Sequence, residues 1–588
     1  MIKFNFKIPF KEYMGLLKTY LKPQGWIIAV FSSLLLIGIL FQLINPQIIR
    51  YFLDSATQNS STNQLIFAAI LFIGFSFAQQ GITLLASYLG ENVGWVATNH
   101  LRKDVAKHVL NLDMTFHKSH TPGSIIERMD GDINALTNFF SSFFINLIGN
   151  FLLMLGVIIL LFRESWMIGT AMSVFIVAAY YVIQRIRRFS APFWDKLRDI
   201  SSDFYGFLSE HLESTEETRA NGATKYVMSK FFKILRKWLP VRVGAFLSFG
   251  LIWITTILIF TVGNATSIGI SSFLWDNGFL SVGTIYMIFY YTELLVKPIE
   301  KLRTQMEDLQ RADASINRIK ELLNTKPKIV DGAGVALPQG AFSIKYENVS
   351  FGYEENSTIL HNVNITIQKG SVLGVVGRTG SGKTTFARLL LRFYDPINGS
   401  IRIDDMDLRD MKLKELRKRI GYVTQQVEIF QASVKDNLTL FDNSIPDKHI
   451  INVLEDIGLG RWYQSLPYGL NTMLNASGSG LSAGEAQLIS FARVFMNNAG
   501  VVILDEASSR LDTVTENLIE AAISKLLVNR TCIVIAHRLS TLKRADDILI
   551  LEDGQVIEYD KQKNLVSDSN SRFYKMLKTG SGIEEMLA

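Results

Sequence analysis

The sequence predicts a multidomain protein in which an all-α transmembrane domain of six helices precedes an α/β domain of the P-loop NTPase type. Six stretches without a charged residue fill the first half of the 588-residue chain, and a glycine-rich phosphate-binding pattern lies in the second half. The length exceeds that of one domain. We expect the transmembrane domain at residues 1–323, a linker at 324–340 and the nucleotide-binding domain at 341–588.

The six predicted spans are the charge-free stretches. They run from Trp26 to Ile49, Ser55 to Gly90, Ile133 to Phe162, Trp166 to Gln184, Val243 to Trp275 and Asn277 to Thr292. A helix needs about 20 apolar residues to cross a bilayer, so the last stretch is long enough only when Glu293 is included. A carboxylate at that depth should face protein or water, and both a structural hydrogen bond to another span and contact with cargo satisfy this requirement.

Charges in the connections predict the orientation. Asp54–Asn63 and Asn264–Asn277 contain no Lys or Arg, and the connection between the third and fourth spans has only Arg163 beside Glu164, so these segments are expected outside. The other connections are basic and are expected in the cytosol. The amino terminus is also expected there, because its lysines precede an apolar stretch too long for a signal peptide. This pattern and anionic lipids account for the net charge of +6, so no nucleic-acid partner is expected.

Some predicted helices are much longer than a bilayer is thick. No proline occurs between Pro46 and Pro122, so a helix from about Gln64 to Asn111 would extend roughly 70 Å at 1.5 Å per residue. The hydrocarbon core measures about 30 Å, so this helix should project far into the cytosol. The same argument applies from Ile133 toward Leu212 and from Tyr226 through Val262.

The two resulting hairpins should have tips that can touch the nucleotide-binding domain. The tips are predicted near Met114–Pro122 and Ser214–Gly222, where the apolar pattern breaks. We expect His117 and His120 in the first tip to be solvated loop residues rather than metal ligands, because no ligand spacing accompanies them.

A phosphate-binding loop is predicted at Gly377–Thr384, whose spelling GRTGSGKT fits the pattern G-x-x-x-x-G-K-[ST]. The apolar run Val372–Val376 before it indicates a buried strand, and a helix is expected from Lys383. Backbone N–H groups of such a loop close on the β-phosphate, the lysine charge faces the β and γ oxygens, and the Thr384 hydroxyl can ligate Mg²⁺. The residues expected to bind the nucleotide here are Arg378, Thr379, Gly380, Ser381, Gly382, Lys383, Thr384 and Thr385.

A second carboxylate site is predicted after the apolar run Val501–Leu504. This run indicates a buried parallel strand, and ligands gather at the carboxyl ends of such strands. Asp505 should orient Mg²⁺, and Glu506 should act as the general base on the attacking water. The single cysteine, Cys532, excludes an intrachain disulfide.

With these motifs the chain resembles an ATP-binding cassette (ABC) transporter, specifically an exporter half-transporter with six spans followed by one cassette. Leu481–Glu485, spelled LSAGE, is similar to the family's LSGGQ signature but differs at its third and fifth positions. The resemblance implies that Ser482 and Gly484 contact the γ-phosphate of an ATP bound by another subunit. Asn475–Ser479, just before it, lacks the acidic residue that exporters often carry there.

The resemblance also implies roles for single residues. Tyr353 matches the family's aromatic residue that stacks on adenine. Gln425 matches the glutamine that reaches Mg²⁺ and the attacking water, and His537 matches the histidine that senses the γ-phosphate. Ser509–Asp512 matches the loop that couples two ATP sites. Structural alternatives stay open for each: a strand-core tyrosine, a turn-forming glutamine, a core histidine and, for Ser482, an ordinary helix cap.

The resemblance implies a function and its partners. Two chains, as a homodimer or with a homologous partner, should hold two ATP molecules with Mg²⁺ head to tail, and hydrolysis should drive export of a drug, lipid or peptide. An ATP-gated channel or regulator and an importer on the same scaffold are the alternatives. The expected location is a bacterial plasma membrane, with membrane lipids as partners.

Overall fold

The computed structural model describes Gly15 and residues 19–58, 60–142, 148–334, 337, 339–354, 357–475, 481–505, 513–536 and 539–587. The chain forms two compact units. The helical unit comprises Met1–Leu110 and Pro122–Thr325, and the nucleotide-binding unit comprises Asn111–Thr121 and Lys326–Ala588. The first predicted cytosolic tip therefore groups with the nucleotide-binding unit.

The helical unit is built from long helices. Its elements are η1 (Lys22–Gln24), α2 (Gly25–Thr57), α3 (Thr62–Asn111), α5 (Pro122–Ile126), the π-helical turn η2 (Glu127–Gly131), α6 (Asp132–Ser142), α7 (Asn150–Glu164), α8 (Trp166–Glu213), α9 (Thr215–Ala220), α10 (Thr224–Asp276), α11 (Val282–Leu294) and α12 (Val296–Asn324). Within the described residues, α2, α3, α8 and α10 are long and apolar enough to cross a membrane. The third predicted span corresponds to α6 and α7, with residues 143–147 outside the described part, and the sixth corresponds to α11 and the start of α12.

The long predicted helices are confirmed with one correction. α3 has 50 residues and matches the expected span from Gln64 to Asn111 closely. The predicted external loop Asn264–Asn277 is wrong, because α10 continues to Asp276 and only residues 277–281 connect it to α11. The segment without Lys and Arg is the last part of α10, and no proline interrupts this helix after Pro240.

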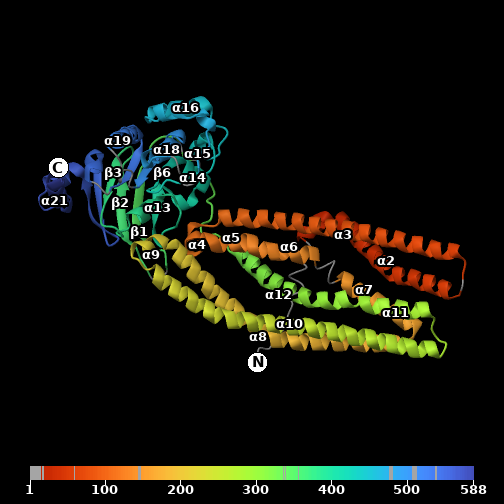
Figure 1. Ribbon diagram of the computed structural model, residues 1–588. Helices are drawn as coiled ribbons and strands as arrows, with labels where there is room; N and C mark the ends of the chain where they lie inside the picture. The colour runs from red at the N-terminus through yellow and green to blue at the C-terminus, as the bar shows by residue number, and fades with distance from the viewer. Residues whose placement is uncertain are drawn as a thin grey trace. The chain divides into compact units, whose positions relative to one another are not determined.

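Helix packing gives the helical unit its core. α8 lies beside α10 along much of its length, α2 packs on α11, and α7 packs on α8 (Figure 1). The buried side chains at the centre of this core include Val157, Leu161, Ile168, Met172, Met287, Ile288 and Tyr291. The apolar spans therefore bury only a stripe against one another, and much of their remaining apolar surface is exposed in the isolated chain.

The nucleotide-binding unit combines two sheets with surrounding helices. Its elements are α4 (Met114–Ser119), β1 (Ile344–Phe351), β2 (Leu360–Ile367), β3 (Val372–Val376), α13 (Lys383–Leu390), β4 (Asn398–Ile403), β5 (Met406–Asp407), η4 (Leu408–Asp410), α14 (Leu413–Arg419), β6 (Ile420–Val423), α15 (Val434–Thr439), α16 (Asp447–Asp456), α17 (Gly460–Ser465), η5 (Gly469–Asn471), α18 (Ala483–Met496), β7 (Val501–Asp505), α19 (Thr513–Leu527), β8 (Thr531–Ile535), η7 (Leu539–Arg544), β9 (Asp547–Glu552), β10 (Gln555–Lys561), α20 (Gln562–Ser567) and α21 (Arg572–Leu587). The predicted fold class, a helical transmembrane domain followed by an α/β P-loop domain, is confirmed.

The larger sheet positions the candidate site. Its strand order is β10-β9-β3-β8-β7-β6, with β10 antiparallel to β9 and the other neighbours parallel. Successive residues of β7 point to opposite faces, so Val502 and Leu504 enter one buried cluster and Val501 and Ile503 enter the other. Burial on both faces explains why β3, β7 and β8 are uninterrupted apolar runs. The smaller sheet, β2-β1-β4-β5, is antiparallel.

Candidate functional site

The predicted phosphate loop lies between the buried strand β3 and the helix α13, as expected. Gly377, Gly380 and Gly382 have φ values of 159°, 87° and 97°. A Cβ atom on Gly377 would lie 2.2 Å from the Leu551 carbonyl oxygen, so only glycine fits there. Lys383 starts α13 and is buried, and its Nζ donates to the carbonyl oxygens of Gly377 at 2.7 Å and Arg378 at 2.9 Å. The lysine side chain thus folds back along the loop that precedes it.

One side chain in this loop indicates a missing hydrogen-bond partner. The hydroxyl of Ser381 is buried, and it has no hydrogen bond within the part of the chain that the structure describes. A buried hydroxyl without a partner is costly, and a phosphate oxygen would supply an acceptor. The unpaired Ser381 hydroxyl therefore supports nucleotide binding by this loop independently of the sequence motif.

Asp505 lies at the carboxyl end of β7, where the sequence placed a carboxylate. It is buried, and its Oδ2 accepts a hydrogen bond of 3.2 Å from the Tyr422 hydroxyl on β6. Burial, together with the nearby carboxylate, raises the pKa of Tyr422 to about 12, so the phenol stays protonated and remains a donor. No sequence motif marks Tyr422 as this partner, although it lies on the neighbouring strand and its Cα pairs with Ile503 in the parallel register.

The oxygen set suits a magnesium ion. Asp505 supplies a carboxylate that is fixed by the hydrogen bond from Tyr422, and the half-buried Thr384 in the first turn of α13 supplies a hydroxyl. No group of three or more His, Cys, Asp or Glu residues that could hold a metal occurs among the described residues. Mg²⁺ typically uses one or two protein oxygens and completes its shell with phosphates and water, so a sparse set fits it.

Three predicted catalytic residues follow three strands of the sheet. Gln425 comes two residues after β6 and is exposed in the following loop. Glu506 directly follows β7 and His537 follows β8 by two residues, but both lie outside the described residues, as does the Ser509–Asp512 loop. Because β3, β6, β7 and β8 are parallel, the carboxyl ends of these strands lie at the same edge of the sheet.

The predicted adenine-stacking residue is set in an aromatic cluster. The Tyr353 ring packs edge to face with Phe351 and Tyr394, with ring centres 5.1 and 5.0 Å apart. Its hydroxyl lies 3.2 Å from the Thr385 Oγ1 in α13. The nitrogen of Lys118, from α4, lies over the same ring. Tyr353 thus contacts both the helix that follows the phosphate loop and the first predicted cytosolic tip.

The signature-like segment forms a helix start. Ser482 is the N-cap of α18: its hydroxyl accepts from the Glu485 N–H at 3.2 Å, and the Glu485 carboxylate accepts from the Ser482 N–H at 2.7 Å. This capping box uses the glutamate that departs from the family signature. The helix-cap alternative for Ser482 is therefore real, and Gly484 is buried in the first turn behind it. Of the neighbouring segment Asn475–Ser479, residues 476–479 lie outside the described part.

Two family models match the chain. The ABC transporter model matches residues 360–509, and the ABC transporter transmembrane region model matches residues 26–299. Both models occur in one chain, in the order that the sequence predicted. Together they cover the long helices through α10, all of α11, the phosphate loop and Asp505.

Relatives and a solved structure agree with these matches. An uncharacterized ABC transporter ATP-binding protein of Bacillus subtilis strain 168, YknV, is 31% identical over 94% of this chain and 92% of its own. An ATP-dependent lipid A-core flippase of Idiomarina loihiensis is 28% identical over 96% of this chain and 97% of its own. The solved structure of a bacterial Atm1-family ABC exporter with ATP bound matches with a TM-score of 0.79 at 24% identity, covering 94% of this chain and 98% of that one, which shows a shared fold.

Proposed function

The chain belongs to the ABC transporter family as an exporter-type half-transporter and transport-coupled ATPase, and we propose that it exports a hydrophobic or amphipathic molecule by alternating access. The cargo class would be a drug, a lipid or a peptide. The protein spans a membrane several times, and we place it in a bacterial plasma membrane with its cassette in the cytosol.

One observation carries the proposal. The phosphate loop, Gln425 and Asp505 follow parallel strands of one sheet, so they emerge at the same edge within a chain that also has long membrane-crossing helices. Lys383 and Ser381 would hold the phosphates, and Thr384, Gln425 and Asp505 would hold Mg²⁺. When bound, Mg²⁺ neutralises the charge that develops on the transferred phosphoryl group. Glu506 would take the proton of the attacking water, and His537 would contact the γ-phosphate.

A second chain is needed to complete each site. α18, which begins with Ser482, packs on α15, α16, α19 and β6, whereas α13, which carries the phosphate-loop lysine, packs on β8. We infer that Ser482 and Gly484 of one subunit reach the ATP that the other subunit binds, as a pair of identical or homologous chains. The exposed amino end of α18 suits this role, because a helix amino terminus attracts anions.

ATP would then favour the closed pair of cassettes, and hydrolysis would remove that preference. A ligand can shift a conformational equilibrium only through its different affinity for the two states. Binding between the cassettes supplies such a difference. The long helices that lead to α4 and α9 would transmit the movement to the membrane.

The experiment is hydrolysis and transport by purified protein in liposomes. Glu506→Gln should lower ATP turnover at least about 100-fold while ATP binding persists, because only general-base assistance is removed. Hydrolysis within twofold of wild type would remove Glu506 from this role.

Transport direction separates the alternatives. NBD-labelled phosphatidylethanolamine in the same liposomes should move away from the cassette side only while ATP is hydrolysed. A channel would conduct with ATP bound to the Glu506→Gln variant, and an importer would move the lipid in the opposite direction.

A further inference from the structure

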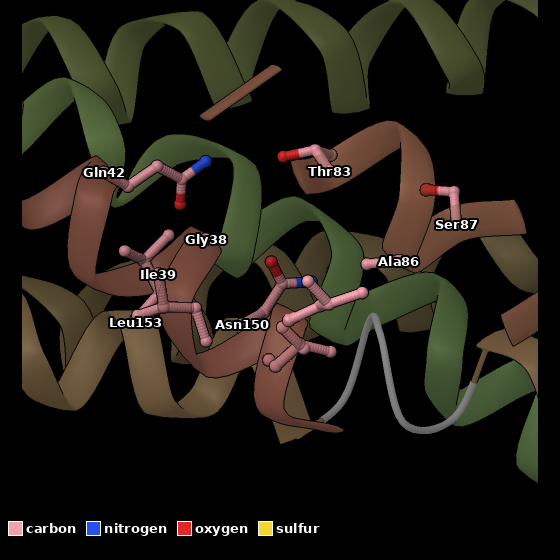
Figure 2. A pocket seen from close by; sticks show the side chains of 11 residues that line it. Gly38, Ile39, Gln42, Thr83, Ala86, Ser87, Asn150 and Leu153 are labelled. Atoms are coloured by element: carbon pink, nitrogen blue, oxygen red, sulfur yellow. The ribbon is translucent and has the colours of Figure 1, made fainter. Parts of the chain in front are cut away.

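A cavity of about 130 Å³ lies among α2, α3 and the start of α7 (Figure 2). Its lining includes the side chains of Gln42, Thr83, Ser87 and Asn150, and none of its lining residues is charged. Figure 2 shows the Gln42 amide and the Thr83 hydroxyl directed toward the same space, with the Asn150 amide beside it. The site therefore combines amide and hydroxyl groups with an apolar wall.

The cavity lies deep in the predicted membrane span. Gly38, which lines it, is midway along the charge-free stretch from Trp26 to Ile49. At 1.5 Å per residue it is roughly 17 Å along the helix from either end of that stretch. A bilayer's hydrocarbon core is about 30 Å thick, so the cavity is within lipid depth rather than at a headgroup surface.

Small residues keep the space open. A Cβ atom on Gly38 would meet only one atom, the Ile82 Cγ2 at 3.6 Å, so its backbone leaves room on this face of α2. Ala86 on α3 and Gly149 before α7 also line the cavity. A volume of about 150 Å³ is enough for a benzene ring, so this cavity can hold a group of similar size but not a whole lipid or peptide.

The polar side chains that line the cavity differ in their hydrogen bonding from the polar side chains one turn away on α2 and α3. Asn45 on α2 donates to the Gln79 Oε1 at 2.8 Å, so these two amides satisfy part of their hydrogen bonding between the helices. By contrast, the half-buried Gln42 side chain and the exposed Ser87 side chain make no hydrogen bond with the described residues. Thr83 donates to the Gln79 carbonyl oxygen at 2.8 Å and keeps its acceptor capacity. Lipid tails cannot satisfy these groups.

We infer that this cavity binds the uncharged, hydrogen-bonding head of an amphipathic cargo, a group that carries amide or hydroxyl functions. The inference rests on the export function proposed above and narrows its cargo class. An ionic head would lose its hydration here without meeting an opposite charge, whereas an amide or hydroxyl head would exchange hydrogen bonds with Gln42, Ser87 and Thr83. The apolar tail of the cargo would extend from the cavity along the helices.

Direct binding without nucleotide tests the site separately from ATP hydrolysis. The full chain in lipid nanodiscs is titrated with tritiated N,N-bis(2-hydroxyethyl)dodecanamide, which has an uncharged amide and hydroxyl head, and with tritiated dodecyltrimethylammonium, which has the same chain length and a cationic head. The signal of empty nanodiscs is subtracted. Wild type should bind the amide saturably and at least about tenfold more tightly than the cation.

Two variants and one control probe the cavity itself. Gln42→Leu should weaken amide binding about tenfold by removing hydrogen bonds, and Gly38→Leu should abolish saturable binding by filling the space. Gly81→Leu adds the same side chain to α3 at a position where a Cβ atom meets nothing within 4 Å, and it should bind within twofold of wild type. Thermal unfolding and size-exclusion profiles like those of wild type establish that each variant is folded.

Two results would overturn the inference. One is amide binding by folded Gly38→Leu that equals wild type, and the other is a wild type that hydrolyses ATP but binds the amide no more tightly than the cation. Absence of ATP hydrolysis would instead contradict the proposed function, because the binding measurement needs no turnover.

Discussion

The Lys118 ammonium lies 3.4 Å from the centre of the Tyr353 ring, within the nucleotide-binding unit. Lys118 is in the last turn of α4, the short helix in the first predicted cytosolic tip, and Asp113 caps the start of that helix. The same carboxylate accepts a hydrogen bond from the Lys328 N–H. The tip is therefore fixed on the nucleotide-binding unit, and its cation faces the ring that the resemblance assigns to adenine. We therefore predict that Lys118 in this tip responds to a nucleotide bound at Tyr353.

Lys118→Met should lower the ATP concentration that gives half-maximal hydrolysis. Phe351 and Tyr394 pack against Tyr353 already, so we expect Lys118 and adenine to compete for one ring face. A cation–π contact at an exposed site contributes about 0.5–1 kcal/mol, so its loss should shift the half-maximal concentration about two- to fivefold. The measurement is ATPase activity against ATP concentration.

The matched control is Lys369→Met, which removes a lysine from a turn of the same unit, between β2 and β3. It should leave the half-maximal concentration unchanged. An unchanged or raised value for Lys118→Met would show that the lysine and adenine do not compete.

Gly283→Ala should destabilise the junction of α2 and α11. The Gly283 N–H donates to the Asp54 Oδ1 at 2.9 Å, and a Cβ atom on Gly283 would lie 2.5 Å from the Arg50 carbonyl oxygen. Arg50 also pairs with Glu164 at the end of α7 at 2.8 Å, so the added methyl group should disturb a contact among three helix ends. Overpacking of this kind costs about 1–3 kcal/mol, and thermal unfolding in detergent should show a midpoint lowered by several degrees.

Gly269→Ala is the control for this change. Gly269 is in α10, and a Cβ atom there meets nothing within 4 Å. Alanine favours a helix more than glycine does, so the control should keep or slightly raise the unfolding midpoint. Equal midpoints for the two variants would contradict the close approach at Gly283.

Periodicity and spacing predicted most of the fold, because the signals involved are local. Charge-free stretches located the long helices, and the apolar runs before Gly377 and through Leu504 located β3 and β7. The external loop placed at Asn264–Asn277 was wrong, because absence of basic residues indicates the side of the membrane and not the end of a helix.

The contacts that complete the site could not be predicted, because they join residues far apart in the sequence. The Tyr422–Asp505 hydrogen bond depends on the register of β6 against β7. The Lys118–Tyr353 contact depends on how Asn111–Thr121 packs within the nucleotide-binding unit, far in sequence from Tyr353. Neither pair has a spacing that marks it. The assigned roles of Glu506 and His537, which lie outside the described residues, stay predictions.

Cys532 should be unreactive in the folded protein. The side chain is fully buried in β8, and burial raises the pKa of its thiol to about 12, so almost no thiolate forms at pH 7.5. A maleimide should label the wild type only after denaturation. Labelling of the native protein at the rate of a free thiol would contradict this burial.

Because the native Cys532 thiol is expected to be unreactive, introduced cysteines can test the membrane topology directly. In the wild-type background, a cysteine at Asn277, which is exposed after α10, should react with an impermeant maleimide added to intact cells. A cysteine at Met114, which is 43% exposed in the tip that also contains His117, should react only after the membrane is opened. Asn59, in the first predicted external connection, lies outside the described residues. Reaction at Met114 but not Asn277 in intact cells would reverse the orientation.

Glu293→Gln should leave stability and cargo stimulation close to wild type. Asn264 on α10 donates a hydrogen bond to the Glu293 Oε1 on α11, and the glutamine side chain keeps an acceptor in that place. The pairing favours the structural alternative over cargo contact.

Asn264→Leu removes the donor and leaves the Glu293 carboxylate without this partner at membrane depth, so it should lower the unfolding midpoint by several degrees. The measurements are thermal unfolding and ATPase stimulation in nanodiscs, both by the uncharged dodecanamide and by dodecyltrimethylammonium at a higher concentration. A Glu293→Gln variant that keeps its basal hydrolysis and its unfolding midpoint but loses stimulation by the cation would instead assign Glu293 to cargo, because only the negative charge has been removed.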